Sequence, residues 1–318
     1  MSPLTWELFG FVVLAMFALD LFQTRKDTPS LKKALVWSLF WFVLAFVFCA
    51  VIYLYWPLMA PESSYTRTDA SVAFLTGYLL EKMLSVDNLF VFALIFSQFA
   101  VPESSRPRIL LWGIIGALAL RAVMIFVGAE LLAQYHWILY IFAVFLIITG
   151  VKLWFTDTEE NSDFASSKLV MFFKKHIPFD DKYHGNQLFA KVSGKTIATP
   201  LLLVVIVIMF TDIMFALDSI PAIFAITQEP FLVFAANVFA LLGLRSLYFV
   251  LQGMLDKFCY LQPALAFILS FIGIKMFLVG TKYEVPTVIS LLTIVAIITL
   301  AIIGSIYKNR SQQQEIQD

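Results

Sequence analysis

The sequence is short of charge and of cysteine. Charged residues make up 14% of its 318 positions, and 22 basic residues balance 22 acidic ones, so the formal net charge is zero. A neutral chain without a long basic tract argues against a nucleic-acid partner. The two cysteines, Cys49 and Cys259, fall in or beside apolar segments and form neither a disulfide framework nor a CxxC zinc knuckle.

Motifs of catalysis and of nucleotide binding are absent as well. The chain contains no GxxxxGK[ST], HExxH or GxSxG sequence. We therefore expect no enzymatic activity, no use of ATP by this chain and no tightly bound cofactor. The first apolar stretch follows MSPLTWELFG, which has no basic n-region or small-residue cleavage site, so we predict a retained membrane span and not a signal peptide.

Apolar residues dominate what remains. Hydrophobic residues make up 61% of the chain, with 33 Phe among them, which is too apolar for a soluble globule of this length. Runs of about 20 apolar residues predict an all-α integral membrane protein with about nine transmembrane helices. We expect these spans at 4–24, 35–57, 70–98, 107–133, 137–155, 199–227, 231–254, 262–281 and 286–307.

Basic residues set the predicted orientation. They gather in alternate connections, whereas the opposite connections are short or poor in base. By the positive-inside rule, the N-terminus lies outside and the C-terminus is cytoplasmic. The basic connections contain Arg25, Lys26, Lys32 and Lys33, then Arg106 and Arg108, then the segment 156–198, and finally Lys308 and Arg310.

Two related stretches indicate an internal duplication. EKMLSVDNLFVFALIF has a counterpart in TDIMFALDSIPAIFAIT, and the two acids are six residues apart in each. Downstream, Arg121 in the first repeat corresponds to Arg245 in the second, and Lys152 corresponds to Lys275. Each unit holds three spans, an odd number, so we predict an inverted repeat of three-helix units. The expected order is two N-terminal helices (1–69), the first repeat (70–155), a cytoplasmic loop (156–198), the second repeat (199–281), and a last helix with a tail (282–318).

Ionisable residues inside apolar spans are the candidate site. A charge at mid-bilayer costs about 2.5–3.5 kcal/mol on insertion scales and usually serves a function. Two antiparallel helices would bring carboxylate, amide and hydroxyl oxygens together without thiolate or imidazole, a ligand set that suits Mn²⁺, Mg²⁺ or Ca²⁺. The predicted ion-binding residues are Glu81, Asp87, Asn88, Asp212, Asp218 and Ser219. The predicted counter-charges are Arg121, Arg245 and Lys275.

A structural interpretation of the same charges stays open. Asp87–Arg121 and Asp218–Arg245 would then be ion pairs that hold the halves in register. The protein would be a membrane scaffold or a stress or metal sensor that binds a partner through the 156–198 loop.

Two local features carry further expectations. Pro221 predicts a kink or break in the second motif, because proline lacks the N–H that the carbonyl of Leu217 needs. The 156–198 loop reads as a solvated loop with an amphipathic helix. A metal site on His176, His184, Asp180 and Asp181 is the alternative there.

Five segments resemble the TerC family of bacterial membrane proteins, in particular its Alx branch. They are FLTGYLLEKMLSVDNLFVF, GALALRAVMIF, ILYIFAVFLIITGVK, FALDSIPAIFAIT and ANVFALLGLRSLYF. The resemblance implies a multi-pass protein of the bacterial inner (plasma) membrane that exports Mn²⁺, with the six ion-binding residues named above as its ligands. The family commonly has an acid three residues before the Asp212 position, where this chain has Met209.

Overall fold

The computed structural model describes residues 1–23, 30–135, 137–155, 168–180, 182–185, 187–192, 195–251, 260–278, 281–283 and 285–315. Its helices are α1 (Pro3–Gln23), α2 (Leu31–Met59), α3 (Arg67–Gln98), α4 (Arg106–Gln134), α5 (Ile138–Phe155), α6 (Lys168–His176), α7 (Pro200–Phe224), α8 (Pro230–Leu241), α9 (Leu244–Leu251), α10 (Leu261–Leu278) and α11 (Thr287–Glu315). A 3₁₀ turn, η1 (Glu103–Ser105), precedes α4, and two strands, β1 (Phe189–Val192) and β2 (Lys195–Ala198), precede α7.

Local sequence signals fix where the helices begin. Thr66 forms a capping box at the start of α3, where its hydroxyl accepts from the Asp69 amide at 3.1 Å and its amide donates to Asp69 Oδ2 at 3.2 Å. Proline stands in the first turn of α4, α7 and α8, a position where its missing N–H costs nothing.

Six helical stretches are long and apolar enough to cross a membrane: Pro3–Asp20, Leu31–Met59, Glu103–Gln134, Pro200–Phe224, Pro230–Val250 and Thr287–Lys308. Two shorter apolar helices cover Ile138–Lys152 and Pro263–Leu278. The 32-residue helix α3 lies outside both sets. It carries Glu81, Lys82 and Asp87 in its central part, so its length suits a bilayer but its charge does not.

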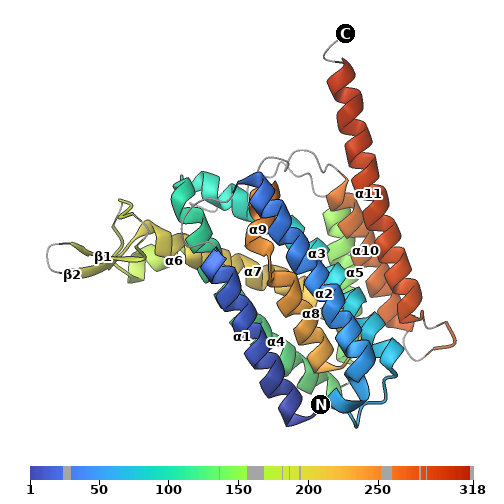
Figure 1. The fold of residues 1–318 in the computed structure, drawn as a ribbon. Helices are drawn as coiled ribbons and strands as arrows, with labels where there is room; N and C mark the ends of the chain where they lie inside the picture. Colours follow the sequence, from blue (N-terminus) through green and yellow to red (C-terminus); the bar gives the residue numbers. More distant parts are fainter. Residues whose placement is uncertain are drawn as a thin grey trace.

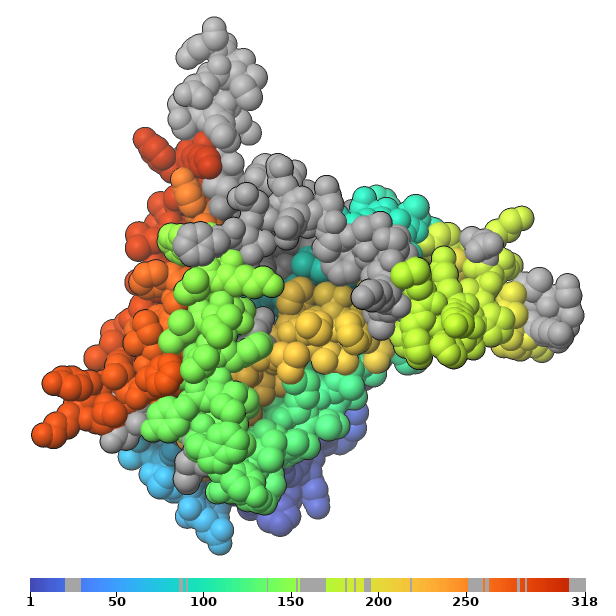
Figure 2. Space-filling model, turned by 180° about the vertical axis from the view of Figure 1, so that it is seen from behind, coloured from blue at the N-terminus to red at the C-terminus, as the bar shows by residue number. Residues whose placement is uncertain are grey.

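The helices form one bundle in which α3 and α4 both pack against α7 and α8 (Figure 1). The N-terminus and the end of α11 lie at opposite ends of the bundle, and α11 extends beyond it. On the rear face, α5 and α10 lie side by side next to α7 (Figure 2). Helices α3 and α7 run in opposite directions, because Gly77 lies against Ile223 whereas Leu89 shares a core cluster with Val204.

The second repeat contains a break, but not at its proline. Helix α7 continues through Pro221 to Phe224, so the proline costs hydrogen bonding only in the last turn and does not end the helix. The span expected at 231–254 is divided instead, since α8 ends at Leu241 and α9 begins at Leu244. Gly243 between them has φ +74°, a left-handed conformation that ends a helix and favours glycine.

The described part of the 156–198 segment contains the expected short helix and, in addition, an antiparallel hairpin. Phe189 in β1 pairs with Ala198 in β2, so the fold is not wholly α-helical. The hairpin and α6 project sideways from the bundle (Figure 1). Tyr183 ties this segment to the end of α3 by donating its phenol hydrogen to the Phe99 carbonyl at 2.5 Å, and burial raises the pKa of Tyr183.

Two glycines let α5 and α10 approach each other closely. A Cβ atom on Gly150 of α5 would lie 2.8 Å from the Ala266 carbonyl oxygen, and one on Gly273 of α10 would lie 3.0 Å from the Ala143 carbonyl oxygen. Backbone atoms cannot move aside as a flexible side chain can. This reciprocal contact is a small-residue interface of the kind that brings membrane helices together.

We therefore expect Gly150→Ala to destabilise the protein, although alanine is the better helix former by about 1 kcal/mol. Overpacking of a tight contact typically costs about 1–3 kcal/mol. Gly10→Ala is the matched control, because nothing lies within 4 Å of a Cβ atom at Gly10 of α1. Thermal unfolding of both purified variants tests this, and equal melting temperatures would show that α5 and α10 tolerate the methyl group.

Candidate functional site

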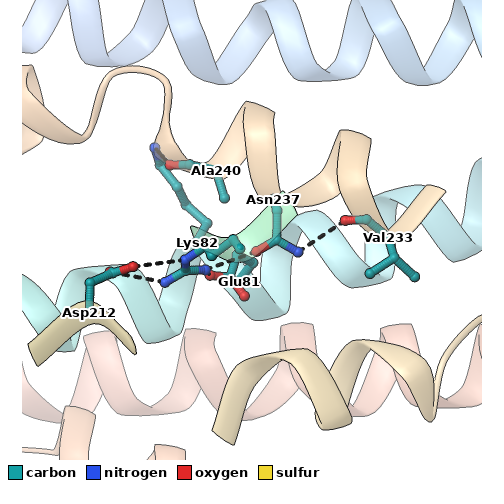
Figure 3. A network of polar contacts seen from close by, with 7 residues as sticks. Glu81, Lys82, Asp212, Val233, Asn237 and Ala240 are labelled. Atoms are coloured by element: carbon teal, nitrogen blue, oxygen red, sulfur yellow. Dashed lines mark hydrogen bonds and ion pairs between the residues drawn. The ribbon is translucent and has the colours of Figure 1, made fainter. Parts of the chain in front are cut away.

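A buried polar network lies where α3, α4, α7 and α8 meet (Figure 3). It consists of Glu81 from α3, Arg121 from α4, Asp212 from α7 and Asn237 from α8. The four residues are between 0% and 3% exposed. A charged group this deeply buried must be compensated by partners, because the interior does not hydrate it.

Arg121 is the centre of this network. Its Nε donates to Asp212 Oδ2 at 3.0 Å and its Nη2 donates to Asp212 Oδ1 at 3.1 Å, a bidentate pair. Its Nη1 donates to Asn237 Oδ1 at 2.9 Å and forms an ion pair with Glu81 Oε1. A planar guanidinium with donors on several edges can satisfy three partners at once, which the point charge of lysine could not do in this geometry.

Asn237 is held in place by its own helix. Its Nδ2 donates to the Val233 carbonyl at 3.0 Å (Figure 3), and its Oδ1 accepts from Arg121. Asn237 was not among the residues predicted from the sequence. The signal was present, because Asn237 is the one polar side chain among the buried residues of α8 between Phe231 and Leu241.

The network holds more negative than positive charge. The two carboxylates and one guanidinium sum to −1 when all three are ionised. Glu81 Oε2 has no hydrogen-bond partner among the described residues, although it is buried. A buried carboxylate oxygen without a partner is costly, so the network has a position that a proton or a cation would satisfy.

Two buried hydroxyls on α3 and α7 lie at the level of Glu81 or one helical turn beyond it. Ser85 is one turn beyond Glu81 on the same face of α3. Helices α3 and α7 are antiparallel, and Gly77 lies against Ile223. Glu81 is one turn after Gly77 on α3, and Ser219 is one turn before Ile223 on α7, so Glu81 and Ser219 lie at the same height in the bundle. The Ser85 and Ser219 hydroxyls are each 1% exposed and, like Glu81 Oε2, have no hydrogen-bond partner among the described residues.

Not all the predicted ligands can be placed. Asn88 is buried on α3, two turns beyond Glu81. Asp87 and Asp218 belong to α3 and α7, but their side chains lie outside the described residues, and so do the predicted pairs Asp87–Arg121 and Asp218–Arg245. The described acidic partners of Arg121 are Glu81 and Asp212.

The other two predicted counter-charges lie elsewhere. Arg245, near the start of α9, binds Asp20 of α1 through an ion pair of 3.3 Å and a hydrogen bond to the Asp20 carbonyl. Lys275 of α10 lines a polar cavity of about 490 Å³ at the end of the bundle where α7 finishes. Glu229 lines the same cavity and accepts from the Ser63 hydroxyl at 2.6 Å.

Met209, three residues before Asp212 on α7, faces α4. A Cβ atom on Gly116 would lie 2.7 Å from its sulfur. With Arg108 and Trp112 it lines a largely apolar cavity of about 690 Å³ between α4, α7 and the hairpin. Met209 is thus a soft, neutral side chain that packs against α4 one helical turn before Asp212.

The alternative metal site in the 156–198 segment gains no support from the described residues. His184 pairs with Asp180 at 2.5 Å. The ring of His176 packs against the Phe172 ring at a tilt of 38°. Asp181 lies outside the described residues, and no group of three His, Cys, Asp or Glu side chains that could hold a metal occurs within them.

Comparisons with known proteins agree over nearly the whole chain. Residues 66–313 match the family described as "Integral membrane protein TerC family". A Photorhabdus laumondii protein named "Putative membrane-bound redox modulator Alx" is 42% identical over 99% of this chain and 98% of its own length. The protein of the same name from Escherichia coli K12 is 42% identical over 97% of this chain and 96% of its own.

A Myxococcus xanthus protein named "Uncharacterized membrane protein STKORF319" is 43% identical over 97% of this chain and 94% of its own length. No solved structure matches the chain. The family match covers most of the sequence and all four helices that supply the buried network, so this chain belongs to the TerC family of integral membrane proteins.

Proposed function

We propose that this protein transports a divalent cation across the membrane, at the network of Glu81 and Asp212. One observation carries the proposal. Two buried carboxylates share a single guanidinium, and Glu81 Oε2 has no hydrogen-bond partner among the described residues. A cation bound there would balance the charge and use this oxygen.

The chemistry of the oxygens favours a hard or borderline ion. Carboxylate, hydroxyl and amide oxygens suit Mn²⁺, Mg²⁺ or Ca²⁺ better than Cu(I) or Zn²⁺, which recruit sulfur and imidazole. Mn²⁺ as the substrate and export as the direction come from the resemblance to the TerC family. The names of the relatives describe redox modulation and no transported ion.

Matched positions of the two sequence motifs support an inverted repeat. Glu81 and Asp212 correspond in the two motifs, and both contact Arg121. Gly150 and Gly273 each stand two residues before a corresponding lysine, and they form the reciprocal contact between α5 and α10. We propose nine spans in two inverted units, with the N-terminus outside, in the bacterial inner membrane.

Alternating access would then be a movement of one unit against the other around the shared site. The polar cavity beside Lys275 is a candidate opening at one end of the bundle. Since the sequence has no nucleotide-binding loop, we propose that proton exchange at the carboxylates drives transport.

A structural role of the network is the second candidate function. The observation in its favour is that Arg121 is bonded on three sides and joins α3, α4, α7 and α8. Such a hub could hold the helices of a scaffold or sensor in register without moving an ion.

Reconstitution separates the two functions. We expect proteoliposomes that contain only this protein to take up Mn²⁺, read as quenching of an enclosed dye, at a rate that depends on an imposed pH gradient. Protein-free liposomes made from the same lipid are the control. Uptake no faster than in that control, with folded protein and gradients of either sign, would contradict transport and favour the scaffold.

A further inference from the structure

The break between α8 and α9 exposes the end of a helix inside the bundle. Gly243 takes a left-handed conformation, and a Cβ atom there would lie 2.7 Å from Cγ of Trp41. Both conformation and space therefore require glycine at this position. Because the chain turns away, the last carbonyls of α8 lose the N–H groups that a following helical turn would supply.

The ammonium group of Lys82 fills the place of those N–H groups. Its Nζ donates to the Ala240 carbonyl at 3.0 Å and to the Leu242 carbonyl at 3.1 Å. Figure 3 shows Lys82 reaching from α3 to Ala240 on α8. The lysine is thus bound by backbone oxygens of a different helix.

Two features near this position attract a positive charge. The carboxyl end of a helix carries a partial negative charge. Asp20 on α1, which is also paired with Arg245, attracts the Lys82 ammonium as well. In membrane proteins, the carbonyls at broken helix ends are a recurrent place for small cations.

We propose that the carboxyl end of α8 is a binding site for a small monovalent cation, separate from the carboxylate network, and that the ammonium of Lys82 occupies it as a tethered ion. The site is formed by the carbonyls of Ala240 and Leu242 with Asp20 nearby. Its ligand class is an alkali cation or a primary ammonium.

The tethered ion joins two parts of the molecule. Lys82 follows Glu81 on α3, so a shift of α3 that changes the carboxylate network also moves the ammonium at the α8–α9 break. Because the chain supplies this cation itself, the break needs no free alkali ion. This inference does not depend on Mn²⁺ transport.

Replacement of Lys82 by alanine, which removes the ammonium group, tests the site. We expect purified Lys82→Ala protein in detergent to melt about 3 °C higher in NaCl, KCl or methylammonium chloride than in N-methylglucamine chloride at equal ionic strength, because the vacated site then binds the small cation. The wild type should melt at the same temperature in all four salts, since its site is filled.

Two control variants sharpen the result. Lys82→Met keeps the volume without the charge and leaves no room, so its melting temperature should not depend on the cation. Lys152→Ala removes an exposed lysine from α5 and should behave like the wild type. Lys82→Ala protein that melts identically in every salt, or that aggregates in every salt while Lys82→Met folds, would overturn the assignment. Either result would leave Mn²⁺ flux to be judged separately.

Discussion

Arg121→Met should be the most damaging single substitution in this protein. It would leave the carboxylates of Glu81 and Asp212 buried in the same place without their shared cation. Removal of one partner from a buried ionic group costs about 3–5 kcal/mol, which is a large part of the stability of an ordinary domain. We expect a lower yield of monodisperse protein and a much lower melting temperature.

Charge and packing can be separated in the same experiment. If charge is the cause, adding Glu81→Gln and Asp212→Asn to Arg121→Met should restore much of the stability, because no buried charge then remains uncompensated. That triple variant should still fail to transport Mn²⁺. Arg108→Met, on the same helix but exposed, is the matched control. A triple variant as unstable as Arg121→Met alone would show that Arg121 acts through its shape.

Unlike Arg121→Met, Glu81→Gln should leave the protein stable, but it should abolish almost all transport. The substitution removes the surplus negative charge, so that Arg121 and Asp212 remain as a balanced pair joined by their two hydrogen bonds. We expect the melting temperature to stay the same or to rise. Loss of a buried charge contact with the ion, worth about 3 kcal/mol, should reduce Mn²⁺ flux by about 100-fold.

Asp212→Asn is the informative comparison for Glu81→Gln. The amide would turn an NH₂ group toward one of the two Arg121 donors that now bind a carboxylate oxygen, leaving that donor without an acceptor. We therefore expect it to lose both stability and flux. Melting curves and proteoliposome flux on the two variants check these expectations. A Glu81→Gln protein with normal flux would favour the structural role of the network.

The sequence predicted most of the helices because their cause is local. Runs of apolar residues as long as the bilayer is thick form helices wherever they occur. The span expected at 35–57 is α2, Leu31–Met59, and the span expected at 107–133 is α4, Arg106–Gln134. The family resemblance of the motifs around Glu81 and Asp218 was confirmed by the family match.

The break after α8 was missed because one glycine within an apolar run is ambiguous. At Gly243 the backbone passes so close to Trp41 of α2 that no side chain would fit. Trp41 is distant in the sequence, so this contact could not be predicted from the residues around Gly243. Pro221 was a clear local signal, but its effect fell on the last turn of α7. In both cases the outcome depended on position in the packed bundle.

By itself, the sequence determined that this is a helical membrane protein of the TerC family and which acids and bases lie within its apolar segments. Only the tertiary structure decided which of them meet. Helical periodicity fixes the direction of a side chain relative to its own helix, but the rotation and height of that helix are set by contacts such as Gly77 with Ile223. Those contacts bring Arg121 to Glu81 and Asp212 and carry Lys82 to the end of α8.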